Sequence, residues 1–245
     1  MESCRIPFND LGYYYGVEKV MKRLLRRLMP ASALLRRANK RTIMQFAENV
    51  GLVYFGFVDQ QSDEHQLIRG LTLSRHHRDT HYCVGSLYNY DIALVERTDV
   101  IRFPGKPDRN QTWLIMQFDL HTTADLPHIF LGLHTHSDTF YANLFATFGQ
   151  LQRAPLGTFG MYDKSFLDRY AIYTTPAESL TAERLFDAEM TKMLAAHFGS
   201  LTIEVADGSL YLYSEHKRIT QSLLETMLKN GVWLAKHLDE RAAHI

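Results

Sequence analysis

The fold of this chain is decided by residues 166–214, which read FLDRYAIYTTPAESLTAERLFDAEMTKMLAAHFGSLTIEVADGSLYLYS. Near its end, two apolar segments rich in β-branched and aromatic residues, 201–206 and 209–213, flank the dipeptide Asp207-Gly208. A type I′ hairpin turn needs positive φ angles, which glycine adopts at no steric cost. The two segments are therefore predicted to be antiparallel strands joined by a tight turn.

A helix and a short strand are predicted ahead of this hairpin. Apolar residues recur at helical spacing between Thr181, a candidate N-cap, and Gly199, which ends the helix. The segment 171–174 has strand character and stops at Pro176. The whole stretch thus predicts a strand, a helix and a hairpin, and it holds no recognisable nucleophile, metal cluster or phosphate loop.

The rest of the chain predicts helices at both ends and strands in the middle. Because the strands are grouped together instead of alternating with helices, the fold class is α+β, a mostly antiparallel sheet with N-terminal helices, the helix-hairpin unit and a C-terminal helix. Helical periodicity covers 17–28, 32–50, 138–152 and 219–238, and strand patterns cover 52–58, 67–74, 82–96, 112–120 and 126–136.

Charge is distributed unevenly along the 245 residues. Lys plus Arg and Asp plus Glu are equal at 27 each, but nine basic residues and only one acidic residue, Glu18, lie between Val17 and Arg41. This segment therefore has a net charge of +8, and the remainder of the chain is acidic. We predict a basic helical arm over 1–50 and a single α+β globular domain over 51–245.

The arm is the candidate binding site. An amphipathic helix with many cations can lie on an anionic membrane surface or dock on an acidic protein partner. The alternative is that its apolar face packs on its own domain while the cations are solvated. Nucleic acid is disfavoured, since no RNA-recognition or helix-turn-helix signature is present. The partner-binding residues are predicted to be Lys19, Lys22, Arg23, Arg26, Arg27, Arg36 and Arg37.

Composition indicates a reducing compartment. The chain has two cysteines, Cys4 and Cys83, which are too few for a disulfide framework, and Cys83 is expected to be a buried structural thiol. The longest apolar run, 50–58, has nine residues, whereas a membrane-spanning helix needs about 20. We therefore expect a cytoplasmic location, with any membrane contact made peripherally through the arm.

A metal site is the alternative chemistry. His134 and His136 are placed on a strand by the predicted pattern, so their side chains would point the same way and share a Zn or Mn ion with Asp138. The segment LHTHSD resembles the first motif of the polymerase-and-histidinol-phosphatase metal-dependent hydrolases. In that family the motif lies near the start of a barrel and further ligand clusters follow it. Here it lies in mid-chain without them.

Two other polar groups are interpreted as structural. The run containing His76, His77, Asp79 and His81 is predicted to be a polar loop between strands, because Arg75 and Arg78 would repel a cation. A separate group at the end of a strand is interpreted as a salt-bridged corner or the edge of a site. It consists of Glu96, Arg97 and Asp99.

Other catalytic signatures are missing from the sequence. It has no Gly-x-Ser-x-Gly elbow, no Gly-rich phosphate loop, no Gly-x-Gly-x-x-Gly and no Cys-x-x-Cys. The sequence therefore favours a non-enzymatic cytoplasmic binding or scaffold protein without a cofactor. The alternative is a metal-dependent hydrolase that uses His134, His136 and Asp138.

One resemblance covers about the last third of the chain. The pattern Phe166-x3-Tyr170-x2-Tyr173, the following helix, and the hairpin around Asp207-Gly208 resemble an uncharacterised family of bacterial domains of unknown function. These motifs are packing motifs, so the resemblance implies a fold and no activity. Members of that family often have a membrane-spanning segment ahead of the domain, and no such segment is evident here.

Overall fold

A computed structural model of the chain describes residues 31–56, 77–102, 105, 107–145, 150–158 and 161–244. The chain forms two compact units, residues 1–41 and 42–245. The helix predicted at 17–28 and the strand predicted at 67–74 lie outside the described residues. Inside them, no helix combines the length and the apolar composition that crossing a membrane requires.

Helix α2 (Ala31–Val50) ends where the sequence predicts. Gly51 has a φ angle of +80°, a left-handed conformation that glycine adopts without strain. The Gly51 N–H donates to the Glu48 carbonyl at 3.4 Å, and the Leu52 N–H donates to the Ala47 carbonyl at 2.8 Å. These two bonds form a Schellman motif, so the end of the helix is determined locally.

The second unit is built on a nine-stranded sheet in which every described pair of neighbouring strands is antiparallel, and it confirms the α+β class. The spatial order is β1-β2-β3-β4-β9-β8-β5-β7-β6. Strands β4 and β9 pair although they are distant in sequence, which joins the two halves of the sheet. The strands are β1 (Val53–Gly56), β2 (Arg78–Leu87), β3 (Tyr90–Ile101), β4 (Arg109–Asp119), β5 (Ile129–Leu133), β6 (Gln152–Arg153), β7 (Tyr170–Thr174), β8 (Thr202–Ala206) and β9 (Ser209–Ser214).

Two hairpins use residues with positive φ angles. The predicted turn between β8 and β9 is confirmed, with φ angles of 50° at Asp207 and 70° at Gly208. A second turn, between β2 and β3, has φ angles of 51° at Tyr88 and 70° at Asn89. The alternating pattern over 82–96 did not predict this turn, because tyrosine rarely adopts a left-handed conformation.

Six helices and one 3-10 turn lie among the described residues. The prediction of a single helix starting at Thr181 is wrong. The segment forms two helices, which are separated by Phe186 and the extended residue Asp187. The Asp187 carboxylate accepts a hydrogen bond from the Met190 N–H at 2.9 Å and caps the second helix. The elements after α2 are α3 (Asp138–Leu144), α4 (Lys164–Leu167), η3 (Pro176–Glu178), α5 (Ser179–Leu185), α6 (Ala188–His197) and α7 (Gln221–Ala242).

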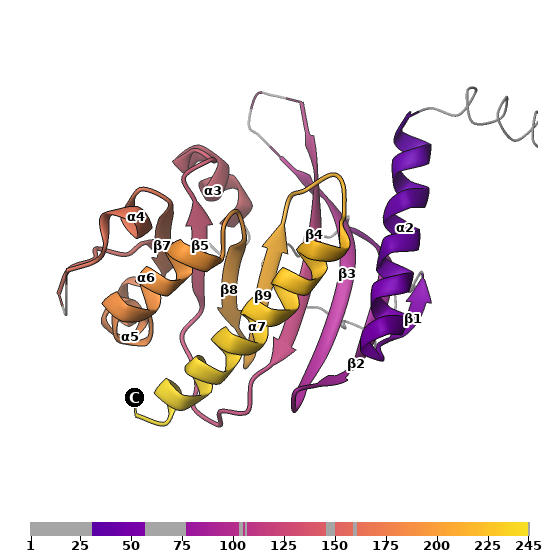
Figure 1. Ribbon diagram of the computed structural model, residues 1–245. Coiled ribbons are helices and arrows are strands. Elements are labelled where there is room, and N and C mark those ends of the chain that lie inside the picture. Colours follow the sequence, from indigo (N-terminus) through magenta and orange to yellow (C-terminus); the bar gives the residue numbers. More distant parts are fainter. Residues whose placement is uncertain are drawn as a thin grey trace, which may run out of the picture. The chain divides into compact units, whose positions relative to one another are not determined.

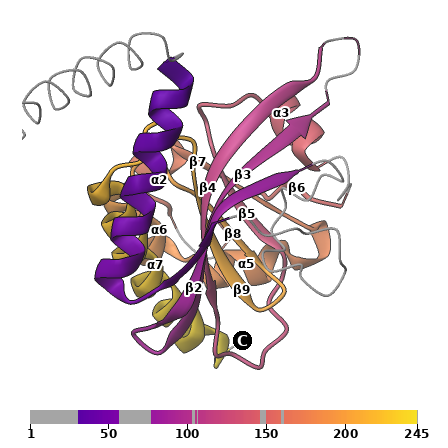
Figure 2. The same ribbon diagram turned by 90° about the vertical axis from the view of Figure 1, so that its right-hand side faces the viewer.

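Helices cover the two faces of the sheet unequally. One core cluster joins the sheet to residues 42–50 of α2 and to α4, α5, α6 and α7, whereas a second, aromatic-rich cluster joins the other face to α3. Figure 1 shows α7 crossing the sheet diagonally, and Figure 2 shows α6 and α7 on the same side of it. The sequence predicted the closing helix, and its residues Leu224, Met227, Leu234 and Leu238 are buried as expected.

Replacing Asp187 by alanine is expected to lower the free energy of unfolding by about 1–2 kcal/mol, because α6 loses its N-cap. The carboxylate also pairs with Arg241 of α7 at 2.5 Å. Asp187→Asn keeps a capping oxygen and loses the ion pair, so its free energy of unfolding should lie between those of the unchanged protein and Asp187→Ala. Urea denaturation followed by circular dichroism measures both, and equal stability of all three proteins would contradict the cap.

The stabilisation that the Asp187 carboxylate contributes is expected to depend on pH. Burial raises the pKa of Asp187, but the hydrogen bonds from Arg241 and from the Met190 N–H outweigh it, so the pKa lies below its ordinary value. The stabilisation is then complete above about pH 4, the ordinary pKa of an unfolded aspartate. It is lost as the pH falls through the lowered pKa of the folded state.

Candidate functional site

The described part of the arm presents four cations on helix α2. Arg36, Arg37, Lys40 and Arg41 are all exposed, and their i, i+1, i+4 and i+5 spacing places them on one side of the helix. Among the residues that the structure describes, none of the four forms an ion pair. The other predicted partner-binding residues lie outside the described residues and are Lys19, Lys22, Arg23, Arg26 and Arg27.

The histidines proposed as metal ligands do not lie on a strand. Strand β5 ends at Leu133, so His134 and His136 belong to the turn that precedes α3, and the prediction of a strand over 126–136 is wrong at this end. The Ser137 hydroxyl, an N-cap, starts α3 here by accepting from the Phe140 N–H at 3.3 Å. The turn therefore removes the alternation that would have aligned the two imidazoles.

Each of the three proposed ligands has a different partner. His134 Nε2 lies 3.1 Å from the Tyr170 carbonyl, and His136 Nε2 lies 2.6 Å from Glu215 Oε1. The Asp138 carboxylate accepts from the Tyr173 hydroxyl at 3.4 Å. Within the described ranges, no three His, Cys, Asp or Glu side chains gather in a metal-binding arrangement. Within this part of the chain, His134, His136 and Asp138 are therefore not gathered as a ligand set.

The second histidine-rich segment is strand and not loop. Strand β2 begins at Arg78, so Asp79 and His81 lie within the sheet, whereas His76 lies outside the described residues. His81 Nδ1 is 2.9 Å from the Tyr54 hydroxyl. The sequence missed the strand because its register shifts between Thr80 and Cys83, an irregularity that breaks the alternating pattern.

A buried ion pair lies on the aromatic face of the sheet. Arg97 donates from Nε to Asp79 Oδ1 at 2.8 Å and from Nη2 to Asp79 Oδ2 at 2.7 Å, and both side chains are almost completely buried. The predicted salt-bridged corner thus has Arg97 at its centre, but its partner comes from β2. The burial of Arg97 could have been predicted from the sequence, because Arg97 follows Ala93 and Val95 at every second position of β3 and so lies on the same buried face.

A second buried polar group lies further across the same face. The Glu204 carboxylate accepts a hydrogen bond from the Tyr213 hydroxyl and lies 2.7 Å from His128 Nε2. Burial, followed by the negative charge of Glu204, raises the pKa of Tyr213 well above its ordinary value. The tyrosine therefore stays protonated and serves as a donor to the carboxylate. Each group pairs a buried carboxylate with the donors beside it in the sheet.

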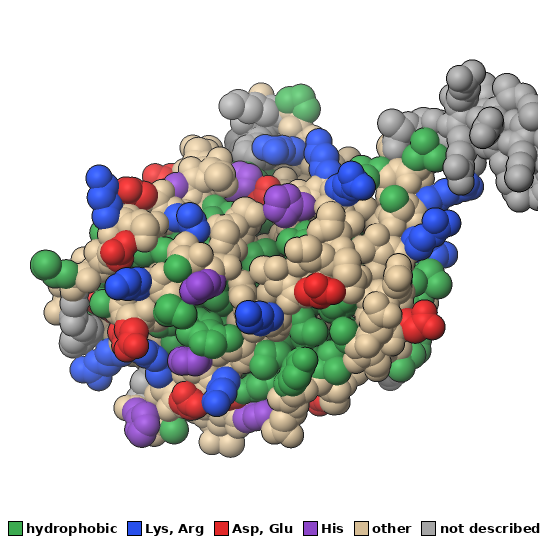
Figure 3. Space-filling view, in the orientation of Figure 1, with side chains coloured by type: hydrophobic (Ala, Val, Ile, Leu, Met, Phe, Trp, Pro, Cys, Tyr) green, Lys and Arg blue, Asp and Glu red, His purple; other side chains and the backbone are tan. Residues whose placement is uncertain are grey.

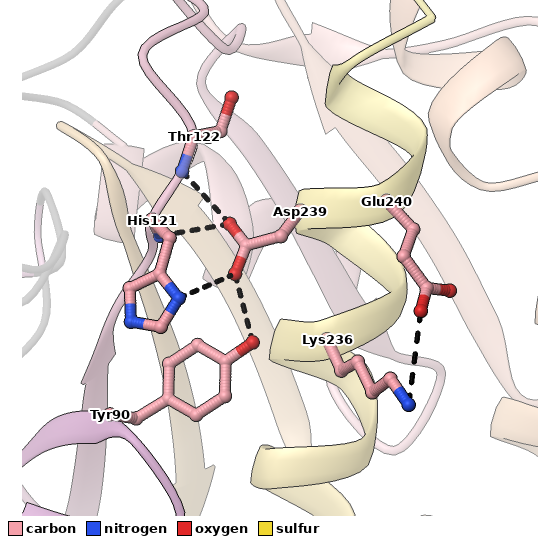
Figure 4. Close-up of polar contacts among 6 residues, drawn as sticks. All are labelled: Tyr90, His121, Thr122, Lys236, Asp239 and Glu240. Carbon is pink, nitrogen blue, oxygen red and sulfur yellow. Dashed lines mark hydrogen bonds and ion pairs between the residues drawn. The ribbon is translucent and has the colours of Figure 1, made fainter.

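Figure 4 shows a polar cluster that fastens α7 to the sheet. The Asp239 carboxylate accepts from the backbone N–H groups of His121 and Thr122, at 2.9 and 3.0 Å, and from the Tyr90 hydroxyl at 2.8 Å. The rings of Tyr90 and His121 stack with centroids 4.5 Å apart. Three donors satisfy this carboxylate, so the cluster is an anchor for the helix and not an open site.

Two surface hollows lie at the β9–α7 connection, and another lies between α6 and α7. One of about 330 Å³ is lined by residues of both charges, including Glu96, Arg109, Glu215 and Lys217. A second, of about 390 Å³, is named here the cationic hollow, and a third, of about 230 Å³ between α6 and α7, is named the apolar slot. The cationic hollow and the apolar slot share His197 and Phe198 in their linings, so they lie next to each other.

Cysteine chemistry is not supported at Cys83. The thiol is fully buried on β2, and this burial raises its pKa to about 12. Because the thiolate is the nucleophile, a thiol with such a pKa is inert at neutral pH. The expectation of a buried structural thiol is confirmed.

Comparisons with known proteins give a likeness of fold. The chain matches no family model and no curated protein sequence. It is similar in structure to the mycobacterial trehalose monomycolate transport factor A, TtfA, with a TM-score of 0.54 and 9% sequence identity. The similarity covers 84% of this chain and 94% of that one. At this identity the two proteins share a fold, and the likeness assigns no function to this chain.

Proposed function

We propose that the protein is a non-enzymatic binding factor of the cytoplasmic side, which attaches to an anionic membrane surface through its basic N-terminal arm. The observation that carries the proposal is the row of exposed cations on α2, Arg36, Arg37, Lys40 and Arg41, which form no ion pair within the described part of the chain. Unpaired cations concentrated on one helix exceed what solubility requires, and they are available to an external anionic surface.

The electrostatic attraction expected of the arm is large. Each Lys or Arg near an anionic membrane contributes about 1 kcal/mol of binding free energy, and the segment from Val17 to Arg41 has nine. The sequence also predicts an apolar stripe beside the cations at 17–28, a combination typical of helices that lie at a membrane interface. An acidic protein partner with an apolar groove would use the same charges and the same stripe, and it is the alternative occupant of the arm.

The structural neighbour supports an accessory role. TtfA is named as a transport factor and not as an enzyme. A binding role for this chain agrees with that name.

Vesicle flotation of the full chain tests the proposal. Replacing Arg36, Arg37, Lys40 and Arg41 by glutamine should lower the partition coefficient onto phosphatidylserine vesicles by at least about 100-fold, since about 1 kcal/mol is lost per charge. Binding should also weaken as salt is raised. Phosphatidylcholine vesicles should bind little of either protein.

The matched control removes four exposed cations from the second unit, Arg109, Lys164, Lys192 and Lys236, and should leave most of the binding. Equal losses in both variants would show a general charge effect and contradict the arm. A different outcome would favour an acidic protein partner. In that case the unchanged protein does not bind the vesicles but is retained on immobilised polyglutamate, and the arm variant is not retained.

A further inference from the structure

Helices α6 and α7 form an antiparallel pair with a crease between them. At one end, Asp187 of α6 pairs with Arg241 of α7 at 2.5 Å. At the other end, the Asn230 side-chain amide donates to the His197 carbonyl at 2.9 Å. Figure 3 looks onto this face, where hydrophobic side chains gather along the crease with Lys, Arg and His side chains beside them. Helix α6 is thus joined to α7 at both of its own ends, and the apolar slot lies between the two helices.

The apolar slot has an aromatic wall and an exposed thioether. The Trp233 indole packs edge-on against Phe198, with ring centroids 6.0 Å apart. Met193 is 38% exposed although it lies beside these rings. Methionine adapts its shape to flexible apolar ligands, and a partly buried tryptophan provides a large apolar surface with a polar edge. The slot is also lined by His197, Lys229 and Asn230, so the part that suits an alkyl chain is the surface formed by Met193, Phe198 and Trp233.

The cationic hollow lies next to the slot and is lined in part by the β9–α7 connection. Its lining includes the basic residues His197, His216 and Arg218, and none of the described residues that line it is acidic. In the described part of the chain, the His197 and Arg218 side chains make no hydrogen bond or ion pair. His216 Nε2 lies 3.0 Å from the Ser200 hydroxyl. The hollow therefore offers an unneutralised guanidinium, imidazoles and hydroxyls to an oxyanion.

From this adjacency we infer that the α6–α7 crease binds an anionic amphiphile, with its oxyanion head group in the cationic hollow and its alkyl chain in the apolar slot. The two hollows share His197 and Phe198 in their linings, so they are close enough for the two ends of one amphiphile to occupy them. Their combined size falls in the range of roughly 300–1,000 Å³ that is usual for small-molecule sites. This site lies in the second unit and does not depend on the arm.

Dodecyl phosphate, kept below its critical micelle concentration, is the probe. Trp233 lines the slot and Trp113 is only 2% exposed, so a change in tryptophan emission reports occupation of the slot. Saturable binding to the full chain is expected, with inorganic phosphate and dodecyl maltoside each binding at least about tenfold more weakly. Equal binding of either control would overturn the inference, since one of the two hollows would then contribute nothing.

Variants separate the two halves of the site. Arg218→Gln should weaken dodecyl phosphate binding about tenfold, the loss expected for one charge-assisted hydrogen bond, and Arg218→Glu should weaken it further. Met193→Glu should abolish binding, because it places a carboxylate in the slot. Lys236→Gln, an exposed cation elsewhere on α7, is the matched control and should bind normally. Unchanged affinity in both Arg218 variants would overturn the inference.

The arm variant keeps this result distinct from the proposed function. Glutamine at positions 36, 37, 40 and 41 should lower the partition coefficient onto phosphatidylserine vesicles by at least about 100-fold while dodecyl phosphate affinity stays unchanged. Loss of both activities in that variant would assign the amphiphile to the arm and contradict a site in the crease. Isothermal titration of Trp233→Phe, which removes the optical signal and keeps an aromatic ring, should still detect binding.

Discussion

Replacing Asp79 by alanine is expected to lower the free energy of unfolding by about 3–5 kcal/mol. Its carboxylate receives two parallel hydrogen bonds from Arg97, and the Arg97 side chain has no exposed surface. Without the carboxylate, a guanidinium cannot shed its charge and stays buried beside Trp113 and Ile115 of the neighbouring strand. The cost therefore includes the desolvated guanidinium charge, which has lost its bidentate carboxylate partner, as well as the two lost hydrogen bonds.

Urea denaturation of three variants measures this cost. Asp91→Ala, which removes an exposed carboxylate from β3, is the matched control and should change stability by less than about 1 kcal/mol. Asp79→Leu combined with Arg97→Met replaces the pair by apolar side chains and should recover much of the loss. A loss below about 1 kcal/mol in Asp79→Ala would contradict the importance of the pair.

The second large effect is expected at Gly231 of α7. A Cβ atom at this position would lie 2.1 Å from both Cε2 and Cζ of Phe118, a fully buried residue of β4. Helix propensity alone would make Gly231→Ala stabilising by about 1 kcal/mol. We expect destabilisation by about 1–3 kcal/mol instead, because the helix or the phenyl ring must move.

The sign of the change decides between propensity and packing. Combining Gly231→Ala with Phe118→Leu frees space for the methyl group, so the double variant should be less destabilised than the sum of the single variants. Thermal or urea unfolding gives the three free energies. Strict additivity, or a more stable Gly231→Ala protein, would show that α7 does not approach the sheet this closely.

Elements whose ends are set by neighbouring residues were predictable from the sequence. The Schellman end at Gly51, the turn at Asp207-Gly208 and the closing helix with its apolar stripe all agree with the structure. Each depends on the φ preference of one residue or on a periodicity within one segment. The break at Asp187 was not predicted, because the apolar residues of α5 and α6 continue one apparent helical stripe across it.

The candidate sites, by contrast, were only partly predictable from the sequence. The cations of α2 were predicted to be available, and Arg36 and Arg37 are exposed. The histidine site was not assembled, because β5 ends before His134 and each proposed ligand has its own partner. The crease that holds the cationic hollow and the apolar slot was not predicted, since it needs Met193 of α6 beside Trp233 of α7.

The sequence by itself determined the α+β class, the local ends of its best-defined elements and the charge asymmetry of the chain. Only the tertiary structure decided the strand order, in which β4 pairs with β9, and the burial of Arg97 against Asp79. The physical reason is that φ preferences, side-chain periodicity and charge are properties of neighbouring residues. Strand pairing and burial instead depend on which distant segments meet, and many pairings satisfy the same local patterns. Residues 166–214 therefore predicted their own hairpin but not the strands on either side of it.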